Sequence, residues 1–306
     1  MPVAGRLGNA FLVRGEHELG FAGPRINCLL CWGSMRAVWI LLPFGVLSVV
    51  LAYGSLHLVV AWLYPRQLFP YAEIDPEERE GQFFLESARG DRIATLYLPG
   101  PSPAAPLLLY SHGNGEDLLD GEERYAWWHE LGYAVLAYDY PGYGTSSGRA
   151  SAAGVKAAAD AVLRHAREDL EYPRERILLW GRSLGGAPTL WMAREGLFLG
   201  VVLEATFRSV LSLAPSLPPL LFLPEPFPND RWAREVRSPV LLVHGILDPI
   251  VPVEHAHRLR EHFQAPLDFH LVENVLHGNV LDGVTPEVEA WLEARREAAS
   301  PGTLSR

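Results

Sequence analysis

Over the last two thirds of the chain, short apolar runs alternate with segments in which apolar residues recur at helical spacing. The runs have strand length, and such continuous apolar strands separated by helices predict a parallel sheet covered on both faces. A weaker pair of strands around the turn Ala88-Arg89-Gly90-Asp91 predicts a β-hairpin ahead of this sheet. The expected strands are residues 82–87, 92–98, 107–111, 134–139, 177–180, 200–204, 240–244 and 267–272, and the expected helices are residues 116–130, 152–168, the segment after Ser183, 254–263 and the segment from Pro286.

Before residue 82 one long apolar run replaces this alternation. Residues 37–64 contain no charged side chain, and as a helix they are long enough to cross a hydrocarbon core of about 30 Å. Residues 1–36 have no period and read as an unstructured leader, with Met35 as an alternative start. Residues 65–81 read as a linker, and residues 82–299 then form a single α/β domain.

The apolar run has two interpretations. A single-pass membrane anchor is favoured over a signal peptide cleaved near Gly54, because the apolar residues 55–64 would then serve no purpose. Trp39 and Trp62 lie near its ends, as in an aromatic belt at a membrane surface. The arginines on the two sides nearly balance, and Arg36, directly beside the run, favours the leader inside and the domain outside the cytoplasm.

The regular alternation breaks once, at residues 206–236, which we expect to form a lid insertion over one end of the sheet. This segment carries six prolines and a mixed set of apolar residues. Its leucines and phenylalanines either line a groove for an acyl chain or pack on the sheet as core. The apolar residues concerned are Leu217, Leu220, Leu221, Phe222, Leu223, Phe227 and Trp232.

Composition narrows the class of partner. The formal net charge of -10 argues against a nucleic-acid ligand. The only two cysteines, Cys28 and Cys31, lie in the leader without a second pair or a nearby histidine. His255 and His257 are two residues apart on an expected helix, so they point in different directions. The sequence therefore implies no metal and no cofactor.

One stretch carries a candidate nucleophile. Residues 177–187 read I-L-L-W-G-R-S-L-G-G-A, a strand that ends at Gly181, a tight turn with Ser183 at its apex, and the start of a helix. The glycines of a G-x-S-x-G turn are required because side chains at Gly181 and Gly185 would collide with neighbouring backbone. Ser183 would project from the sheet, and the N–H of Leu184 would face a developing oxyanion. The pattern alone also fits a structural turn.

Five motifs in order make the chain resemble the α/β-hydrolase superfamily. They are His112-Gly113-Asn114-Gly115, residues 139–146 (D-Y-P-G-Y-G-T-S), residues 181–186 (G-R-S-L-G-G), residues 244–252 (H-G-I-L-D-P-I-V-P) and His277-Gly278. Within the superfamily, the chain looks similar to small membrane-anchored serine hydrolases of the depalmitoylase-like and serine-aminopeptidase-like kinds. The resemblance implies Ser183 as nucleophile, Asp248 as acid and His277 as base, with oxyanion N–H groups from Asn114 and Leu184.

The expected topology supports the same set of residues. Asp248 and His277 each follow a buried strand, and parallel strands place their following loops at one edge of the sheet, where ligands bind. Ser183, Asp248 and His277 should therefore converge although they are far apart in the chain. Their order, Ser then Asp then His, is the order of this fold.

These observations predict a serine hydrolase that cleaves a small-molecule carboxylic ester or thioester through an acyl-enzyme. A serine peptidase is the first alternative, because the fold hosts peptidases, but no acidic pocket for a peptide amino terminus is recognisable. A non-catalytic scaffold is the second, because a fold alone does not establish activity.

Overall fold

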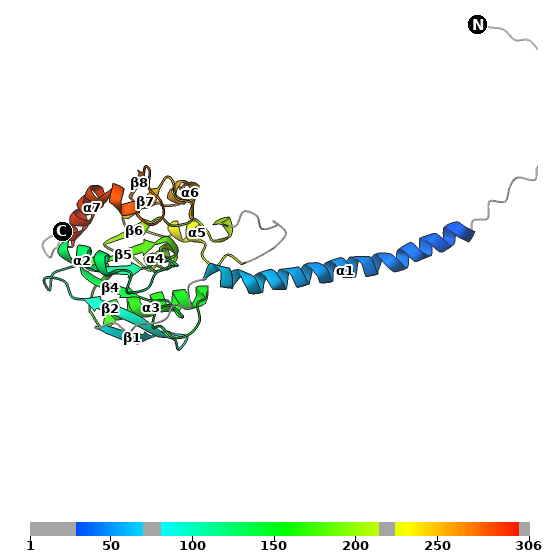
Figure 1. The fold of residues 1–306 in the computed structure, drawn as a ribbon, viewed down its shortest axis with the longest axis horizontal. Helices are drawn as coiled ribbons and strands as arrows, with labels where there is room; N and C mark the ends of the chain where they lie inside the picture. Colours follow the sequence, from blue (N-terminus) through cyan, green and yellow to red (C-terminus); the bar gives the residue numbers. More distant parts are fainter. Residues whose placement is uncertain (1–28, 70–80, 214–223, 300–306) are drawn as a thin grey trace, which may run out of the picture. The chain divides into compact units, whose positions relative to one another are not determined.

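The computed structural model describes residues 29–69, 81–213 and 224–299. The chain divides into two compact units, Met1–Leu56 and His57–Arg306. Most of helix α1 (Leu29–Leu68) belongs to the first unit, and the second contains an eight-stranded sheet with helices (Figure 1).

The sheet has the order β1-β2-β4-β3-β5-β6-β7-β8, and β1 and β8 are its two edges (Figure 1). Strands β3 to β8 are parallel to one another, whereas β1 and β2 form an antiparallel hairpin and β2 is antiparallel to β4. The strands are β1 (Gln82–Glu86), β2 (Arg92–Leu98), β3 (Leu107–Ser111), β4 (Ala134–Tyr138), β5 (Ile177–Arg182), β6 (Gly200–Glu204), β7 (Val240–Gly245) and β8 (Leu267–Val272). The predicted parallel sheet and the predicted hairpin are both confirmed.

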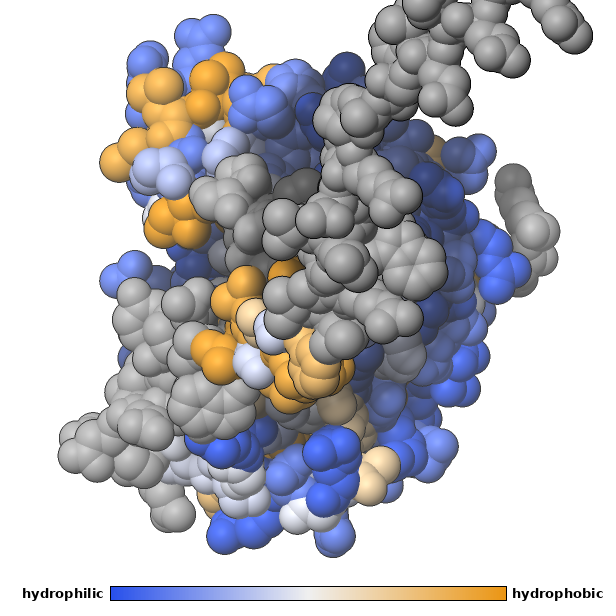
Figure 2. Space-filling view, turned by 90° about the vertical axis from the view of Figure 1, so that its right-hand side faces the viewer, coloured by the Kyte–Doolittle hydropathy of each residue, from blue (hydrophilic) through white to orange (hydrophobic). Residues whose placement is uncertain are grey.

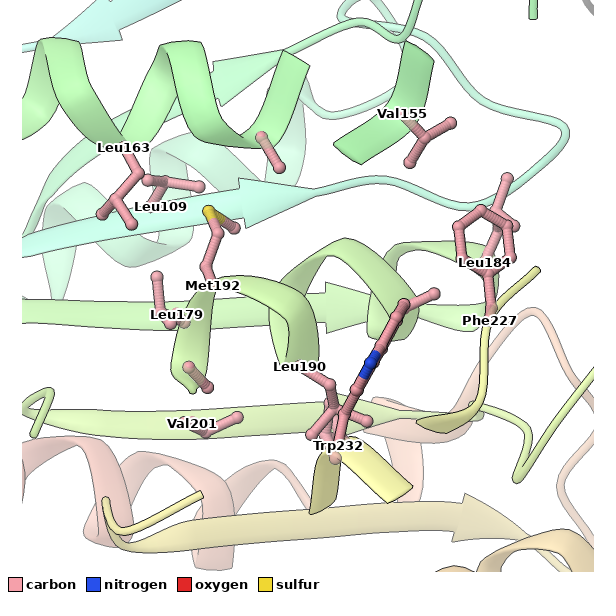
Figure 3. Close-up of a cluster of buried hydrophobic side chains, with 14 of the residues drawn as sticks. Leu109, Val155, Leu163, Leu179, Leu184, Leu190, Met192, Val201, Phe227 and Trp232 are labelled. Carbon is pink, nitrogen blue, oxygen red and sulfur yellow. The ribbon is translucent and has the colours of Figure 1, made fainter. Parts of the chain in front are cut away.

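Helices cover both faces because alternate residues of the buried strands point to opposite sides. Leu109 and Leu179 face one cluster of buried side chains, to which α3, α4, α5 and α6 contribute (Figure 3). Leu108 and Leu178 face the other cluster, which α2 and α7 complete. The helices after α1 are α2 (Glu122–Glu130), α3 (Ala152–Glu168), α4 (Gly186–Ala193), α5 (Asn229–Ala233), α6 (Glu254–Arg260) and α7 (Thr285–Ala298), with 3₁₀ turns η1 (Arg174–Arg176), η2 (Ser183–Gly185), η3 (Leu211–Leu213) and η4 (Val280–Gly283).

After α1, two helix boundaries differ from the sequence prediction by more than one residue. The helix expected over residues 116–130 begins only at Glu122, because side chains hold the preceding loop in a non-helical form. Asp139 Oδ1 accepts a hydrogen bond from the N–H of Leu118 at 2.9 Å, and the Glu116 carboxylate accepts one from the N–H of Gly113. Helix α6 ends at Arg260, one turn before the expected end at Phe263.

Helix α1 extends beyond both ends of the predicted span 37–64. It continues through Pro65, which removes one helical hydrogen bond, and ends at Leu68, so that part of the predicted linker is helical. The carbonyl of Leu68 accepts a hydrogen bond from the Asn114 side chain and Phe69 is buried, and these contacts help to hold the last turn in place. The window Leu42–Val60 is apolar and long enough to cross a membrane.

The insertion over residues 206–236 is only partly described, because residues 214–223, which include Leu217, Leu220, Leu221 and Phe222, lie outside the described residues. In the described part, Phe227 and Trp232 are buried in the cluster to which α3, α4, α5 and α6 contribute (Figure 3). These two side chains therefore belong to the core and do not line a groove. The lid itself stays a prediction.

Candidate active site

The five residues predicted for the site all lie at the carboxyl edge of the parallel sheet. Asn114 follows β3, and Ser183 and Leu184 follow β5. Asp248 follows β7, and His277 follows β8. Parallel strands end at the same edge of a sheet, and so residues as far apart in the sequence as Asn114 and His277 lie at one edge.

Ser183 occupies a strained turn between β5 and α4. Its φ is +50°, a conformation that costs most residues free energy and that persists only when the surroundings impose it. The surroundings do so here: a Cβ on Gly181 would lie 2.4 Å from the carbonyl oxygen of Gly185, and one on Gly185 would lie 1.9 Å from that of Ser111. The expected reason for both glycines is thus confirmed. Thr206 also donates a hydrogen bond from Oγ1 to the carbonyl of Ser183 at 2.8 Å.

Ser183, His277 and Asp248 form a continuous hydrogen-bonded chain. Ser183 Oγ lies 2.8 Å from His277 Nε2, and His277 Nδ1 lies 2.6 Å from Asp248 Oδ2. All three residues are buried. In the tautomer with a proton on Nδ1, the imidazole donates to the carboxylate and leaves Nε2 free to accept the serine proton.

Asp248 is held as a carboxylate. Burial raises its pKa, but hydrogen bonds from His277 and from the N–H groups of Val251 and Ile250, the latter two at 2.9 Å to Oδ1, outweigh burial. The net effect holds the pKa of Asp248 below its ordinary value. The side chain therefore stays charged near neutral pH and can orient the imidazole.

The loop after β3 is held by several side chains. Asn114 donates from Nδ2 to the carbonyl of Leu68 at 2.9 Å and accepts from the hydroxyl of Tyr143 through Oδ1. Tyr140 donates its hydroxyl proton to the carbonyl of His112 at 2.7 Å. His112 itself is buried against the Tyr140 ring, which fits a structural role for this histidine. The Asn114 side chain is thus used for anchoring the loop.

A buried ionic network lies next to Ser183. Arg182, the residue before the serine, pairs with Glu116 and with Glu204, and donates from Nη2 to the carbonyl of His277 at 3.3 Å. Glu204 in turn accepts two hydrogen bonds from Arg124, at 2.8 and 2.9 Å, and one from Trp180 Nε1. Burial raises the pKa of Glu204, but the charges of Arg124 and Arg182 outweigh it, so the net pKa is lowered.

Sequence reasoning missed most of this network. Glu204 is recognisable as an acid that ends a buried strand, but nothing in the chain pattern shows its partners. Arg182 occupies a variable position of the G-x-S-x-G turn, and an arginine at the end of an apolar strand, directly before the nucleophile, is the one sequence signal that points to an ionic partner. Arg182 is linked to the loop of Asn114 by its ion pair with Glu116. It is linked to the loop of His277 by its hydrogen bond to the His277 carbonyl.

In the described part of the chain, no group of three or more His, Cys, Asp or Glu side chains is arranged to hold a metal ion. His255 is buried, and its Nδ1 accepts a hydrogen bond from the N–H of Arg208 at 3.2 Å. His257, two residues further along α6, contacts the ring of Phe269 instead. The two histidines diverge, as their spacing predicts.

Comparisons with known proteins agree with this architecture. The model of the alpha/beta hydrolase family matches residues 107–301. The alpha/beta hydrolase domain-containing protein 17B of Xenopus tropicalis is 30% identical over 199 residues, which cover 65% of this chain and 69% of that protein. The esterase domain of a Rhodothermus marinus protein is 26% identical, with a TM-score of 0.55 over 70% of this chain and 97% of that one.

An esterase of Pyrococcus furiosus shares the fold, with a TM-score of 0.58 at 14% identity, covering 74% of this chain and 96% of that chain. The family match spans every strand of the parallel sheet and all five residues of the predicted site. The chain therefore belongs to the α/β-hydrolase family.

Proposed function

We propose that this protein is a membrane-anchored serine hydrolase that cleaves carboxylic esters or thioesters through an acyl-enzyme. The observation that carries the proposal is the hydrogen-bonded chain from Ser183 through His277 to Asp248, with the serine at a strained turn at the carboxyl edge of the sheet. A charged Asp248 and a buried serine within hydrogen-bond distance of an imidazole are what nucleophilic catalysis by serine requires.

In the first half of the reaction, Ser183 Oγ bonds to the substrate carbonyl carbon and its proton passes to His277 Nε2. The bond from that carbon to the leaving oxygen or sulfur then breaks, and the imidazolium returns the proton to the departing alcohol or thiol. Asp248 orients the imidazole and stabilises its charged form. In the second half, water attacks the acyl-enzyme with His277 as base, which releases the acid and regenerates Ser183.

The oxyanion of each tetrahedral intermediate needs preorganised donors. The main-chain N–H groups of Asn114 and Leu184 suit this role, because the Asn114 side chain is used to hold the loop and Leu184 directly follows the nucleophile. Each such donor typically contributes about 3 kcal/mol to transition-state stabilisation.

The similarity to the esterase domain from Rhodothermus marinus supports an ester as substrate. Thioesters follow the same steps with a better leaving group. The test is a hydrolysis panel with full-length protein, comparing p-nitrophenyl esters of graded chain length, acyl thioesters and aminopeptides. Ester or thioester turnover that is lost in Ser183→Ala and His277→Ala supports the proposal. Turnover of aminopeptides alone would replace it with a peptidase.

A fluorophosphonate probe gives an independent test, because it reacts with activated serines and needs no knowledge of the substrate. We expect labelling of the wild type and none of Ser183→Ala. Labelling of another serine in that variant would overturn the assignment of the nucleophile.

The anchor rests on the apolar window Leu42–Val60 in helix α1. We expect full-length protein to remain in membranes through carbonate washing, with the hydrolase domain outside the cytoplasm. Complete release by carbonate would favour a cleaved leader. Protease protection in sealed vesicles measures the side on which the domain lies.

A further inference from the structure

Four large apolar side chains are exposed on the two loops that carry Asp248 and His277. They are Ile246, Leu247, Ile250 and Leu276, called the apolar rim here, and their exposed fractions lie between 38% and 64%. Leu247 directly precedes Asp248, and Leu276 directly precedes His277. Single exposed leucines are common on protein surfaces, but four around one site mark an interaction surface.

The rim is one surface because backbone hydrogen bonds join its loops. The N–H of Leu247 donates to the carbonyl of Val275 at 3.2 Å, and that of Ile246 to the carbonyl of Val272 at 2.9 Å. The same loops also send Val251 and Val275 into the protein, where both are buried. Val251 and Val275 thus anchor the loops from inside, whereas each side chain of the rim stays exposed by more than a third. Figure 2 shows hydrophobic residues gathered on one face amid a mostly hydrophilic surface.

Helix α1 limits how far this edge can lie from a membrane. The apolar window ends at Val60, and the helix continues to Leu68, a rise of about 12 Å at 1.5 Å per residue. Leu68 is hydrogen-bonded to Asn114, and Phe69 is buried in the core. Polar headgroups extend only about 5–7 Å beyond the hydrocarbon on each side. The loop of Asn114 is therefore tethered close to the membrane surface if α1 spans the bilayer.

The order of strands places Ser183 between this tether and the rim. Asn114 follows β3, Ser183 follows the adjacent β5, and the rim follows β7 and β8 on the other side. Strands lie about 4.8 Å apart, so the three features occupy one edge within roughly 20–25 Å.

We propose that the apolar rim docks on the surface of the bilayer that α1 crosses, so that Ser183 receives acyl chains from the lipid phase. The proposal rests on the anchoring and hydrolase function proposed above and adds the docking surface and a lipid-embedded substrate. Transfer of aliphatic side chains from water into the membrane interface is favourable, and four of them together favour contact of this edge with the bilayer.

The first test measures depth and does not depend on activity. Full-length protein with Cys28→Ser and Cys31→Ser receives a single cysteine at Ile250→Cys, labelled with an environment-sensitive dye. The matched control is Leu197→Cys, a leucine exposed by 52% that lies between α4 and β6 at the opposite edge of the sheet. Both proteins are reconstituted into phosphatidylcholine vesicles containing lipids with a nitroxide quencher.

Docking predicts that the dye at position 250 is quenched at least about threefold more than the dye at 197, since interfacial side chains enter the bilayer by about 5–10 Å. Equal quenching in protein that floats with the vesicles would overturn the docking alone. Protein that does not float with vesicles would overturn the anchor and the docking together. Neither outcome depends on whether Ser183 is a nucleophile.

The second test uses two substrates in the same vesicles, a long-chain ester dissolved in the bilayer and a water-soluble acetate ester. The readout is the ratio of the two rates, which cancels any general loss of activity. In Leu247→Ser combined with Leu276→Ser, this ratio should fall about tenfold, whereas Leu197→Ser should leave it unchanged. An unchanged ratio in the double variant would contradict the docking. Absence of both activities in the wild type would instead contradict the hydrolase function.

Discussion

The ion pairs at the two edges of the parallel sheet differ in how far they are exposed to water. At the amino edge, Arg174 and Glu195 form an ion pair at 3.2 Å, with side chains that are 28% and 41% exposed. At the carboxyl edge, the Arg182 side chain is 10% exposed and that of Glu204 is fully buried. Exposed pairs of the first kind contribute about 0–1 kcal/mol, whereas removing one partner of a buried pair costs about 3–5 kcal/mol.

The difference teaches where this fold fixes geometry. A buried ion pair adds little net stability, because desolvation offsets most of the attraction. What the network at the carboxyl edge does provide is fixed geometry, because Arg182 links the turn of Ser183 with the loops of Asn114 and His277. The amino edge holds no candidate site residue, and both partners of its ion pair are exposed enough to hydrogen-bond water instead of each other.

The largest effect should come from the carboxylate behind His277. Asp248→Asn keeps the shape of the site but favours the wrong tautomer of the imidazole, so kcat should fall about 10³–10⁴-fold. Glu195→Gln, the matched change at the amino edge, should alter kcat less than about twofold. The check is steady-state kinetics on a p-nitrophenyl ester. A tenfold or smaller loss in Asp248→Asn would contradict the proposed role of Asp248.

Substituting a glycine by alanine should destabilise the protein far more at the carboxyl edge than at the amino edge. In Gly185→Ala the added carbon would meet the carbonyl oxygen of Ser111 at 1.9 Å, and we expect a loss of more than about 3 kcal/mol or failure to fold. In Gly196→Ala at the amino edge it would meet the Cδ of Arg174, a flexible side chain, at 2.9 Å. That variant should stay within about 1 kcal/mol of the wild type. Denaturant unfolding of both proteins measures the difference, and equal values would refute the steric account.

The ionic network should act on turnover more than on binding. Arg182→Met leaves Glu116 without its arginine and removes the link to the His277 carbonyl, so kcat should fall about 10–100-fold with KM nearly unchanged. Arg182→Lys keeps the charge but cannot span three partners, and should recover only part of the loss. Arg174→Met at the amino edge is the control.

For this comparison, kinetics are measured well below the melting temperature of each variant, so that unfolding does not contribute. A purely structural arginine would lower the melting temperature while leaving kcat of the folded protein intact. That result would remove Arg182 from the positioning of the site.

The smallest effect concerns pH, through His255 at the start of α6. Burial, together with the charge of Arg208, lowers its pKa to about 4, and its Nδ1 must stay unprotonated to accept the N–H of Arg208. The unfolded chain binds this proton near pH 6.5, so between pH 6.5 and 4 the unfolded state holds more protons. Stability should therefore fall as the pH falls through this range.

His255→Gln retains an acceptor that does not titrate, so the decline in melting temperature between pH 6.5 and 4 should be shallower than in the wild type. Identical slopes would show that His255 does not carry this dependence. At pH 7 and above the two proteins should differ only by a constant amount.

Most of the fold could be read from the chain because local and long-range signals agree. The strands 107–111 and 200–204 have the predicted bounds, since each is a continuous apolar run that ends at polar or turn residues. Ser183, Asp248 and His277 could be assembled because parallel strands bring their following loops to one edge. The hydrogen-bond distances among them could not be derived, but their meeting follows from topology alone.

What the sequence could not supply is side-chain pairing across distant loops. Arg182 and Glu116 are far apart in the chain, and a buried arginine has no periodicity that would name its partner. The late start of α2 has the same origin in part, because the carboxylate of Asp139, on another loop, accepts the main-chain N–H of Leu118. Asp117, Asp120 and Gly121 are also weak helix formers, so local propensity and the tertiary hydrogen bond both favour the late start.

Phe69 sets a limit on where the chain can be divided. Its side chain is buried in the cluster that also contains Leu184 and Phe227, and its neighbour Leu68 holds Asn114. A protease that cut just after Phe69 would release a domain lacking both, and losing a buried phenylalanine costs about 3–5 kcal/mol. Shedding from the membrane would then inactivate the domain as well as relocate it. Soluble versions made for crystallisation should for the same reason begin before Leu68.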